Sequence, residues 1–198
     1  MKKFVVTITR QFGSLGRPIA RELATRLGVE FYDRDIVEQV SRRMELPVSV
    51  ISKEEERAKT GFFYMRFPLG TETTATQDMI FDVQKDLILD LAERQSCIIV
   101  GRCSDAVLQN DAGHFGVFIY ASYKKRIENC ISHLHMTAAE AEKSIEAVDK
   151  AREAYHKRYA GFSPWDCRHK NLMIDSGMLG VSGTVNVLES AIREHFAD

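Results

Sequence analysis

The sequence contains no long apolar run, few prolines and no marked excess of either charge. Because a membrane-spanning helix needs about 20 consecutive apolar residues, we expect none and no membrane partner. The opening Met1-Lys2-Lys3 leads at once into a β-branched segment, so we also expect no signal peptide. The formal net charge of −1 creates no whole-chain field favouring nucleic acid, so a nucleic-acid partner is not expected either.

Cysteine is scarce as well, and its four copies form no Cys-x-x-Cys pair. This usage predicts reduced thiols and a cytoplasmic protein. Cys130, His133 and His135 lie close together in the sequence and could suggest a metal site. Three ligands crowded at one helix end do not easily surround an ion, and no fourth is evident. We therefore interpret them as a coincidental surface cluster and expect no metal held by protein ligands alone.

The remaining pattern is an alternation of strands and helices without repeats or low-complexity linkers. The predicted strands cover residues 4–9, 29–32, 97–101, 115–121 and 171–175, and the longest predicted helices cover 77–94 and 137–159. This order predicts one α/β domain, residues 1–198, with a mainly parallel sheet. Ligands of such sheets bind at the carboxyl ends of the strands, so polar residues there are the first functional candidates.

Two stretches are less regular. Residues 48–70 include an aromatic loop with Phe62, Phe63, Tyr64 and Phe67. Its rings could stack on a base, anchor a small subdomain or form a homodimer contact. The basic stretch 152–170, with interleaved aromatic residues, suits either a lid that closes over phosphate or a solvated helix.

A glycine turn near the start carries the strongest functional signal. Residues 4–9 are apolar and β-branched, Gly13 and Gly16 follow, and helical spacing begins directly afterwards. A strand that passes through glycines into a helix presents backbone N–H groups at a positive helix end, which suits phosphate. Relative to the P-loop pattern G-x-x-x-x-G-K-[ST], Gly16 fits, whereas Gln11, Arg17 and Pro18 replace the first glycine, the lysine and the hydroxyl residue.

Two other interpretations of this turn remain open. It could be a plain strand–helix connection in an α/β domain. It could also belong to a dinucleotide fold, because Asp33 or Asp35 lies about 20 residues beyond the glycines, where a ribose-binding acid is expected. Against the latter, the first glycine of G-x-G-x-x-G would fall at Gln11.

Further motifs follow the turn in a fixed order. They are Thr7-Ile-Thr-Arg-Gln-Phe-Gly-Ser-Leu-Gly-Arg17, Gly28-Val-Glu-Phe-Tyr-Asp-Arg34, Ile98-Ile-Val-Gly-Arg102, Val117-Phe-Ile-Tyr-Ala-Ser122 with Arg126, and Asp149-Lys-Ala-Arg152. This series, spread over essentially the whole chain, resembles the cytidylate kinase-like family of P-loop proteins. The resemblance implies a three-layer sandwich around a five-stranded parallel sheet, with residues 48–70 as an acceptor-side insertion and about 133–170 as a lid-like helical region.

The resemblance also implies roles for individual residues. Donor phosphates would be held by Gly13, Ser14, Leu15, Gly16, Arg17 and Pro18, and the acceptor by Asp33, Arg34, Arg102, Asp149 and Arg152. Asp149 would face the cytidine side, and Arg152 would approach phosphate. Gln39 and Cys103 depart from the cytidylate kinase pattern, which has a phosphate-binding arginine near the first and an aspartate at the second.

The chain is therefore predicted to transfer phosphate from ATP, with Mg²⁺, to a small acceptor such as CMP or dCMP. Arg17, Arg102 and Arg152 would supply the catalytic positive charge, since phosphoryl transfer depends on positioning and charge. Asp149, Arg152 and His156 share one face of a predicted helix, although an exposed ion pair of little consequence would show the same spacing. The alternatives are a nucleotide- or anion-binding regulatory protein with little catalysis, or a kinase for a non-nucleotide acceptor.

Overall fold

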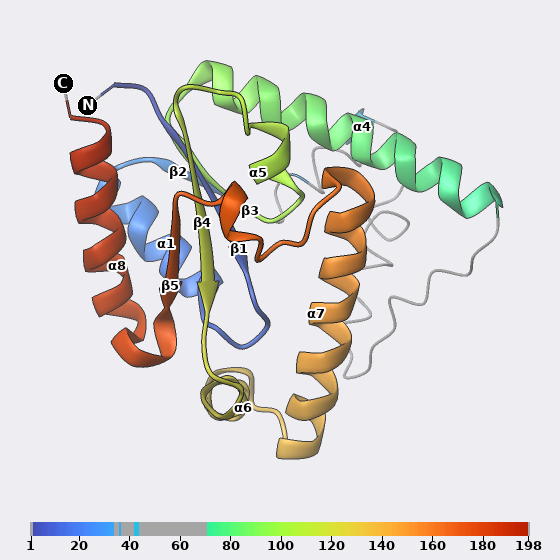
Figure 1. Cartoon of the computed structure of the whole chain (residues 1–198), viewed down its shortest axis with the longest axis vertical. Helices are drawn as coiled ribbons and strands as arrows, with labels where there is room; N and C mark the ends of the chain where they lie inside the picture. Colours follow the sequence, from blue (N-terminus) through green and yellow to red (C-terminus); the bar gives the residue numbers. More distant parts are fainter. Residues whose placement is uncertain (1, 34–35, 37–41, 44–70, 198) are drawn as a thin grey trace.

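The computed structural model describes residues 2–33, 36, 42–43 and 71–197, with the backbone alone for 71–76. Its strands are β1 (Val5–Arg10), β2 (Glu30–Tyr32), β3 (Cys97–Val100), β4 (His114–Tyr120) and β5 (Leu172–Asp175). Its helices are α1 (Gly16–Leu27), α4 (Thr71–Arg94), α5 (Ser104–Val107), α6 (Tyr123–Leu134), α7 (Ala138–Ala160), the 3₁₀ helix η2 (Cys167–His169) and α8 (Ser176–His195) (Figure 1). The predicted strands and the longest helices are confirmed within a few residues, except that α4 begins earlier.

The five strands form one sheet in the order β2-β3-β1-β4-β5, and all neighbours run parallel. β1 is the central strand. The segment that follows it therefore starts in the middle of the edge formed by the carboxyl ends of the strands. A dinucleotide fold places the first three strands in the order 3-2-1. Here β3 lies between β2 and β1, and the dinucleotide interpretation is therefore wrong.

Helices cover both faces of the sheet, as the three-layer prediction requires. On one face α1 and α8 pack over alternate residues of β1, including Val6 and Ile8, in the larger core cluster. On the other face Val5 and Ile99 pack against the inner side of α4, including Leu87 and Ile88. The strands are apolar on both sides because both sides are buried. Figure 1 shows α1 and α8 on one side of the sheet and α4, α5 and α7 on the other.

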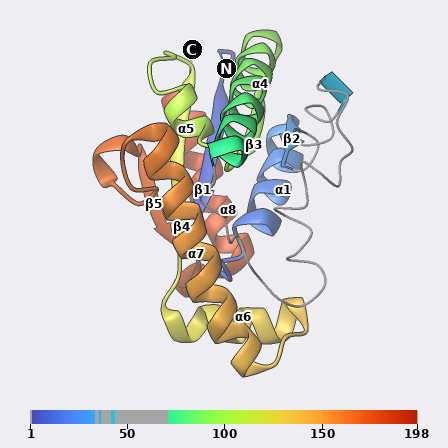
Figure 2. The same cartoon turned by 90° about the vertical axis from the view of Figure 1, so that its right-hand side faces the viewer.

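A third, smaller apolar cluster joins α6 to α7. It contains Cys130, Ala141 and Ile145. Phe12, in the turn that follows β1, packs against it. α7 begins at a complete capping box, in which the Thr137 side chain accepts from Glu140 N and the Glu140 side chain accepts from Thr137 N. Figure 2 shows α6 lying across the foot of the molecule, with α7 rising from it alongside the sheet.

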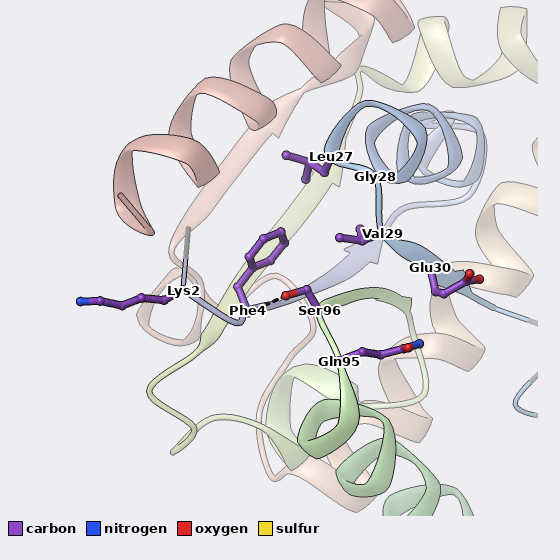
Figure 3. Close-up of a pocket in the computed structure, with 8 residues that line it drawn as sticks. All are labelled: Lys2, Phe4, Leu27, Gly28, Val29, Glu30, Gln95 and Ser96. Carbon is purple, nitrogen blue, oxygen red and sulfur yellow. Dashed lines mark hydrogen bonds between the residues drawn. The ribbon is translucent and has the colours of Figure 1, made fainter. Parts of the chain in front are cut away.

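A pocket of about 470 Å³ lies at the opposite edge, near the amino ends of β1, β2 and β3 (Figure 3). It is lined by Lys2, Phe4, Leu27, Gly28, Val29, Glu30, Gln95 and Ser96. Gly28 ends α1 there with a left-handed φ of 66°, a conformation that glycine adopts without a steric penalty. Because parallel sheets bind ligands at the carboxyl ends of their strands, this pocket is not the candidate site. None of the described helices has the length and apolar character that crossing a membrane requires.

A buried charged cluster fixes α7 against the sheet layer. Asp105 of α5 contacts both His156 of α7 and Lys170, and all three side chains are almost fully buried. The His156 ring faces an acceptor at each nitrogen, with Nδ1 2.8 Å from Phe162 O and Nε2 3.0 Å from Asp105 Oδ2. Burial alone would raise the pKa of Asp105, but the hydrogen bond from His156 and the charge of Lys170 outweigh it and lower that pKa.

Replacing Lys170 by methionine should strongly destabilise the fold. Lys170→Met keeps an apolar stem but leaves the buried carboxylate of Asp105 without its lysine partner, and breaking a buried ion pair in this way typically costs about 3–5 kcal/mol of unfolding free energy. Urea denaturation at neutral pH measures this loss. Because the pKa of Asp105 is lower in the folded state, its stabilisation is present above about pH 4 and lost on further acidification. The pH dependence below pH 4 should therefore be weaker in the variant.

The matched control is Arg168→Met, two residues earlier, where the arginine is 80% exposed and pairs with Asp166. This exposed ion pair should contribute little to the free energy of unfolding, so the control should unfold at nearly the same urea concentration as the wild type. Equal losses in the two variants would contradict a stabilising role for the buried cluster.

Candidate phosphate-binding site

The candidate phosphate loop connects β1 to α1 at the carboxyl edge of the sheet. Gly13 and Leu15 both adopt left-handed backbone conformations, with φ of 76° and 58°, and α1 begins at Gly16. Within the described part of the chain, no protein atom accepts a hydrogen bond from the N–H groups of Gly13, Leu15, Gly16 or Arg17. Such N–H groups at a helix N-terminus are suited to bind an anion.

Gln11 shows why a glycine is not needed at the start of the loop. Its backbone φ is not left-handed, and its N–H still donates to Ile119 O of β4 at 3.0 Å. Its side-chain Oε1 accepts from Ala121 N at 3.2 Å. The residue therefore extends the pairing of β1 with β4 and fixes where the loop leaves the sheet.

Ser14 is fully buried and contributes to the interior of the loop. Its hydroxyl donates to Gln11 O at 2.9 Å, and its own carbonyl accepts from the Ser176 hydroxyl at 2.6 Å. Ser176 begins α8, directly after β5. The Ser14 hydroxyl thus stabilises the turn of the loop, and Ser176 at the start of α8 binds the loop backbone.

Gly13 has no room for a side chain. A Cβ atom there would lie 2.8 Å from Arg126 O and 3.0 Å from Cys130 Sγ, both on α6. Gly13 O also accepts from the Asn129 side-chain amide at 2.8 Å. The glycine is required both by its positive φ and by the close approach of α6.

Arg10, the last residue of β1, lies between two turns of the site. Its side-chain stem runs against Gly16, where a Cβ would be 2.8 Å from Arg10 Cβ, and its guanidinium lies against Gly101 at the end of β3. The sequence pattern assigned Arg10 no role, although its place at a strand end was a signal that it belongs to the site.

Arg17 and Asp33, predicted to serve donor and acceptor respectively, contact each other. Arg17 Nε lies 2.8 Å from Asp33 Oδ2, where the Arg17 side chain is 43% exposed and that of Asp33 is 10% exposed. The P-loop cation therefore has a carboxylate partner in this structure. Pro18 occupies the first turn of α1, which its fixed φ suits, but it supplies neither a hydroxyl nor an N–H.

The turn after β3 is an unusual run of three left-handed residues. Gly101, Arg102 and Cys103 have φ of 74°, 62° and 52°. Non-glycine residues are rarely left-handed and carry strain of about 1–2 kcal/mol each. Arg102 is half-buried and lies just after the carboxyl end of β3. Burial raises the pKa of the Cys103 thiol, so this residue stays neutral and does not replace the charge of an aspartate.

Three predicted residues of α7 share the face turned toward the sheet edge. Asp149 Oδ1 accepts from Phe12 N at 2.7 Å, and its Oδ2 pairs with Arg126. Arg152 donates to Arg10 O at 3.2 Å and lies over the Phe12 ring. His156, one turn further, reaches Asp105. The alternative of an exposed Asp149–Arg152 pair is wrong, because Asp149 binds the loop and α6 instead.

Arg126, which the ordered motifs included without a role, joins the loop to α7. It is 8% exposed, pairs with Asp149 and lies 3.4 Å from Phe12 O through Nη1. Its Nε atom is buried without a hydrogen-bond partner in the described residues. Its place in the motif with Ser122 was the available signal, since the four-residue spacing from the N-cap puts it one turn into α6.

Some predictions fall outside the described residues, namely those on Arg34, Asp35, Gln39 and the 48–70 segment. Among the residues that are described, no group of three or more potential metal ligands comes together. Cys130 is buried against the loop, whereas His133 and His135 are exposed. These three residues thus occupy different environments.

The sheet order and the glycine loop at the end of β1 define a P-loop protein of the α/β kinase type. The sequence model of the cytidylate kinase-like family matches residues 5–178, and the chain belongs to that family. A search of curated proteins finds no match.

Solved structures share the fold over nearly the full chain. An uncharacterized protein from Eubacterium ventriosum has 21% identity and a TM-score of 0.74, covering 96% of this chain and 98% of its own. A shikimate kinase from Acinetobacter baumannii, in complex with shikimate, has 12% identity and a TM-score of 0.56, covering 100% and 97%. A gluconokinase from Sinorhizobium meliloti has 12% identity and a TM-score of 0.58, covering 97% and 93%. At these identities the likeness shows the fold.

Gly13→Ala should impair phosphate binding beyond its effect on stability. The left-handed φ alone should cost about 1–2 kcal/mol of folding free energy, and the added Cβ would also push the loop from α6. Gly28→Ala is the matched control, because Gly28 has φ 66° but no atom within 4 Å of its added Cβ. Calorimetric titration with ADP should show weaker binding in Gly13→Ala and unchanged binding in Gly28→Ala. Equal ADP affinity in both variants would contradict this assignment.

Proposed function

We propose that the protein transfers the terminal phosphoryl group of ATP to a small acceptor, with the nucleoside monophosphates CMP and dCMP as the first candidates. The observation that carries this proposal is the loop at the end of β1, whose Gly13, Leu15, Gly16 and Arg17 N–H groups have no acceptor among the described residues. Family membership and the kinase fold support the same reaction class.

The residues around the loop fit the phosphates of a nucleotide. The N–H groups and Arg17 would bind the β- and γ-phosphates. Arg102 and Arg152 would hold the acceptor and the moving phosphoryl group, whose charge is spread over its equatorial oxygens. Arginine presents several fixed donors and suits phosphate oxygens better than a single ammonium group. The proposal assigns Asp33 and Arg34 to the acceptor's sugar and base side.

The loop offers little to a magnesium ion. Pro18 has no hydroxyl, and the nearby carboxylate of Asp33 is held by Arg17 at 2.8 Å. When bound, Mg²⁺ would neutralise phosphate charge and be held mainly by phosphate oxygens and water, as this ion often is. The positive charge supplied by the protein comes from arginine side chains.

Two observations favour a second candidate, a nucleotide- or anion-binding regulatory protein with little catalysis. The P-loop cation is paired with Asp33, and Pro18 removes the hydroxyl at the next position. Both features leave the backbone N–H groups of the loop available to an anion. Both also take away side-chain groups that would assist phosphoryl transfer. A kinase with a non-nucleotide acceptor is the third candidate, supported by the shared fold of the shikimate kinase and the gluconokinase.

A coupled assay with ATP and Mg²⁺ distinguishes these candidates. The acceptor panel should contain nucleoside monophosphates, shikimate and gluconate. We expect turnover with CMP or dCMP, and a loss of about 10²–10³-fold in kcat/KM for Arg17→Ala, because a phosphate-directed donor is removed. Arg17→Lys should lose less, since it keeps the charge.

The control is Arg193→Ala on α8, because Arg193 is similarly exposed at 48% and also pairs with one carboxylate, Glu189. It should retain full activity. No turnover above Arg17→Ala with any nucleotide would exclude the nucleotide kinase. ATP binding measured by calorimetry, without transfer to any acceptor, would favour the regulatory protein.

A further inference from the structure

The outer side of the phosphate loop is held by α6 and α7. Four contacts converge on residues 12 and 13. The Phe12 N–H donates to Asp149, Phe12 O lies 3.4 Å from Arg126 Nη1, Gly13 O accepts from Asn129, and the Phe12 ring packs on the apolar cluster between the two helices. A surface loop usually exposes such groups to water, whereas here protein side chains bind them.

Asp149 is the centre of this arrangement. Its Oδ1 accepts the Phe12 N–H at 2.7 Å, and its Oδ2 pairs with Arg126, so both carboxylate oxygens are engaged. Arg126 and Asp149 side chains are only 10% and 19% exposed. Hydrogen bonds to charged groups are stronger than neutral ones, and partial burial strengthens them further. The carboxylate therefore fixes the loop relative to two helices at once.

We propose that Asp149 is a positioning residue of the phosphate loop and does not contact the substrate. Its carboxylate, together with Arg126 and Asn129, sets the backbone of Phe12 and Gly13. The N–H groups of Gly13, Leu15 and Gly16 are thereby preorganised to bind phosphate. This inference rests on the proposed function in that the bound phosphate is taken to be a nucleotide's, and it replaces the acceptor-side role that the family pattern implies for Asp149.

Such support would matter more here than in a loop with the full P-loop pattern. Arg17 is paired with Asp33, and Pro18 lacks both a hydroxyl and an N–H. The backbone N–H groups therefore carry a larger share of phosphate binding. Preorganised donors bind most strongly when their geometry is fixed before the ligand arrives.

Whether replacing Asp149 weakens or tightens ADP binding shows whether its carboxylate acts by positioning the loop or by its negative charge. Removing the negative charge of Asp149 leaves Arg126 unpaired beside the loop, and electrostatics alone then predicts tighter ADP binding. Loss of positioning predicts the opposite. We expect Asp149→Ala to weaken ADP binding by about 10- to 100-fold, because small displacements of a binding group have effects of this size.

Calorimetric titration with ADP should compare the wild type with Asp149→Ala, Asp149→Asn and Glu153→Ala. Asparagine can still accept the Phe12 N–H but cannot pair with Arg126, so its affinity should be intermediate. Glu153 lies one turn along α7 in a partly exposed pair with Lys157 at 2.7 Å, and its removal should leave ADP affinity unchanged. Hydrogen exchange adds a direct readout, because the Phe12 amide should exchange faster in Asp149→Ala while β4 and α8 keep their protection.

Unchanged or tighter ADP binding in Asp149→Ala would overturn the proposal, as would unchanged exchange at Phe12. A higher acceptor KM with unaltered ADP affinity would also overturn it and return Asp149 to the acceptor side. If the wild type binds ADP but transfers phosphate to no acceptor, the proposed function fails while titration and exchange still decide the role of Asp149. Asp149→Asn provides the same comparison should Asp149→Ala fail to fold.

Discussion

Backbone polar groups that leave regular structure must find other partners, and this constraint shapes the whole candidate site. Residues 12–15 follow β1 in the middle of the sheet, and neither neighbouring strand continues the ladder for them. Gln11 extends the pairing with β4 by one more residue, and Ser14 closes the turn from inside. The helices α6 and α7 bind the outer side, and the N–H groups at the start of α1 are left for an anion.

Positive charge is the second organising feature. Arg10, Arg102, Arg126 and Arg152 come from β1, the β3 turn, α6 and α7, and the parallel sheet brings those elements to one edge. Guanidinium groups beside the loop attract anions, although Asp149 pairs with Arg126 and Asp33 pairs with Arg17. Gly16 leaves room for Arg10, because a Cβ atom there would lie 2.8 Å from Arg10 Cβ. The fold therefore combines backbone donors and guanidinium groups around one position.

The placement of α7 depends on a different kind of interaction. Asp105, His156 and Lys170 form their contacts away from water, on the side of α7 that also carries Asp149 and Arg152. A buried charged group is stable only while its partners remain in place. The cluster consequently holds the helix in one position relative to α5 and the approach to β5. Asp149 and Arg152 lie two turns and one turn before His156 on α7, so their contacts with the loop benefit from that fixed position.

Local patterns along the sequence were sufficient for the strands, most helix ends and the glycine loop. The predicted strands 97–101 and 115–121 correspond to β3 and β4, and the predicted helix 137–159 corresponds to α7 within one residue at each end. The ordered motifs also led to the family, since their residue types are set by a shared fold. The choice between a kinase and a dinucleotide fold required the strand order, which depends on crossovers and is only weakly encoded locally.

The partners within the site were decided by tertiary structure alone. Asp149 lies 137 residues from Phe12 in sequence, and no local spacing indicates that its carboxylate meets that N–H. The same is true of Arg17 with Asp33, and of Arg10 beside Gly101. Sequence by itself determined which residues stand at the strand ends and helix faces, because periodicity and turn chemistry are local. Which of these residues touch depended on how the helices pack across the sheet edge, because distant segments meet only in the folded chain.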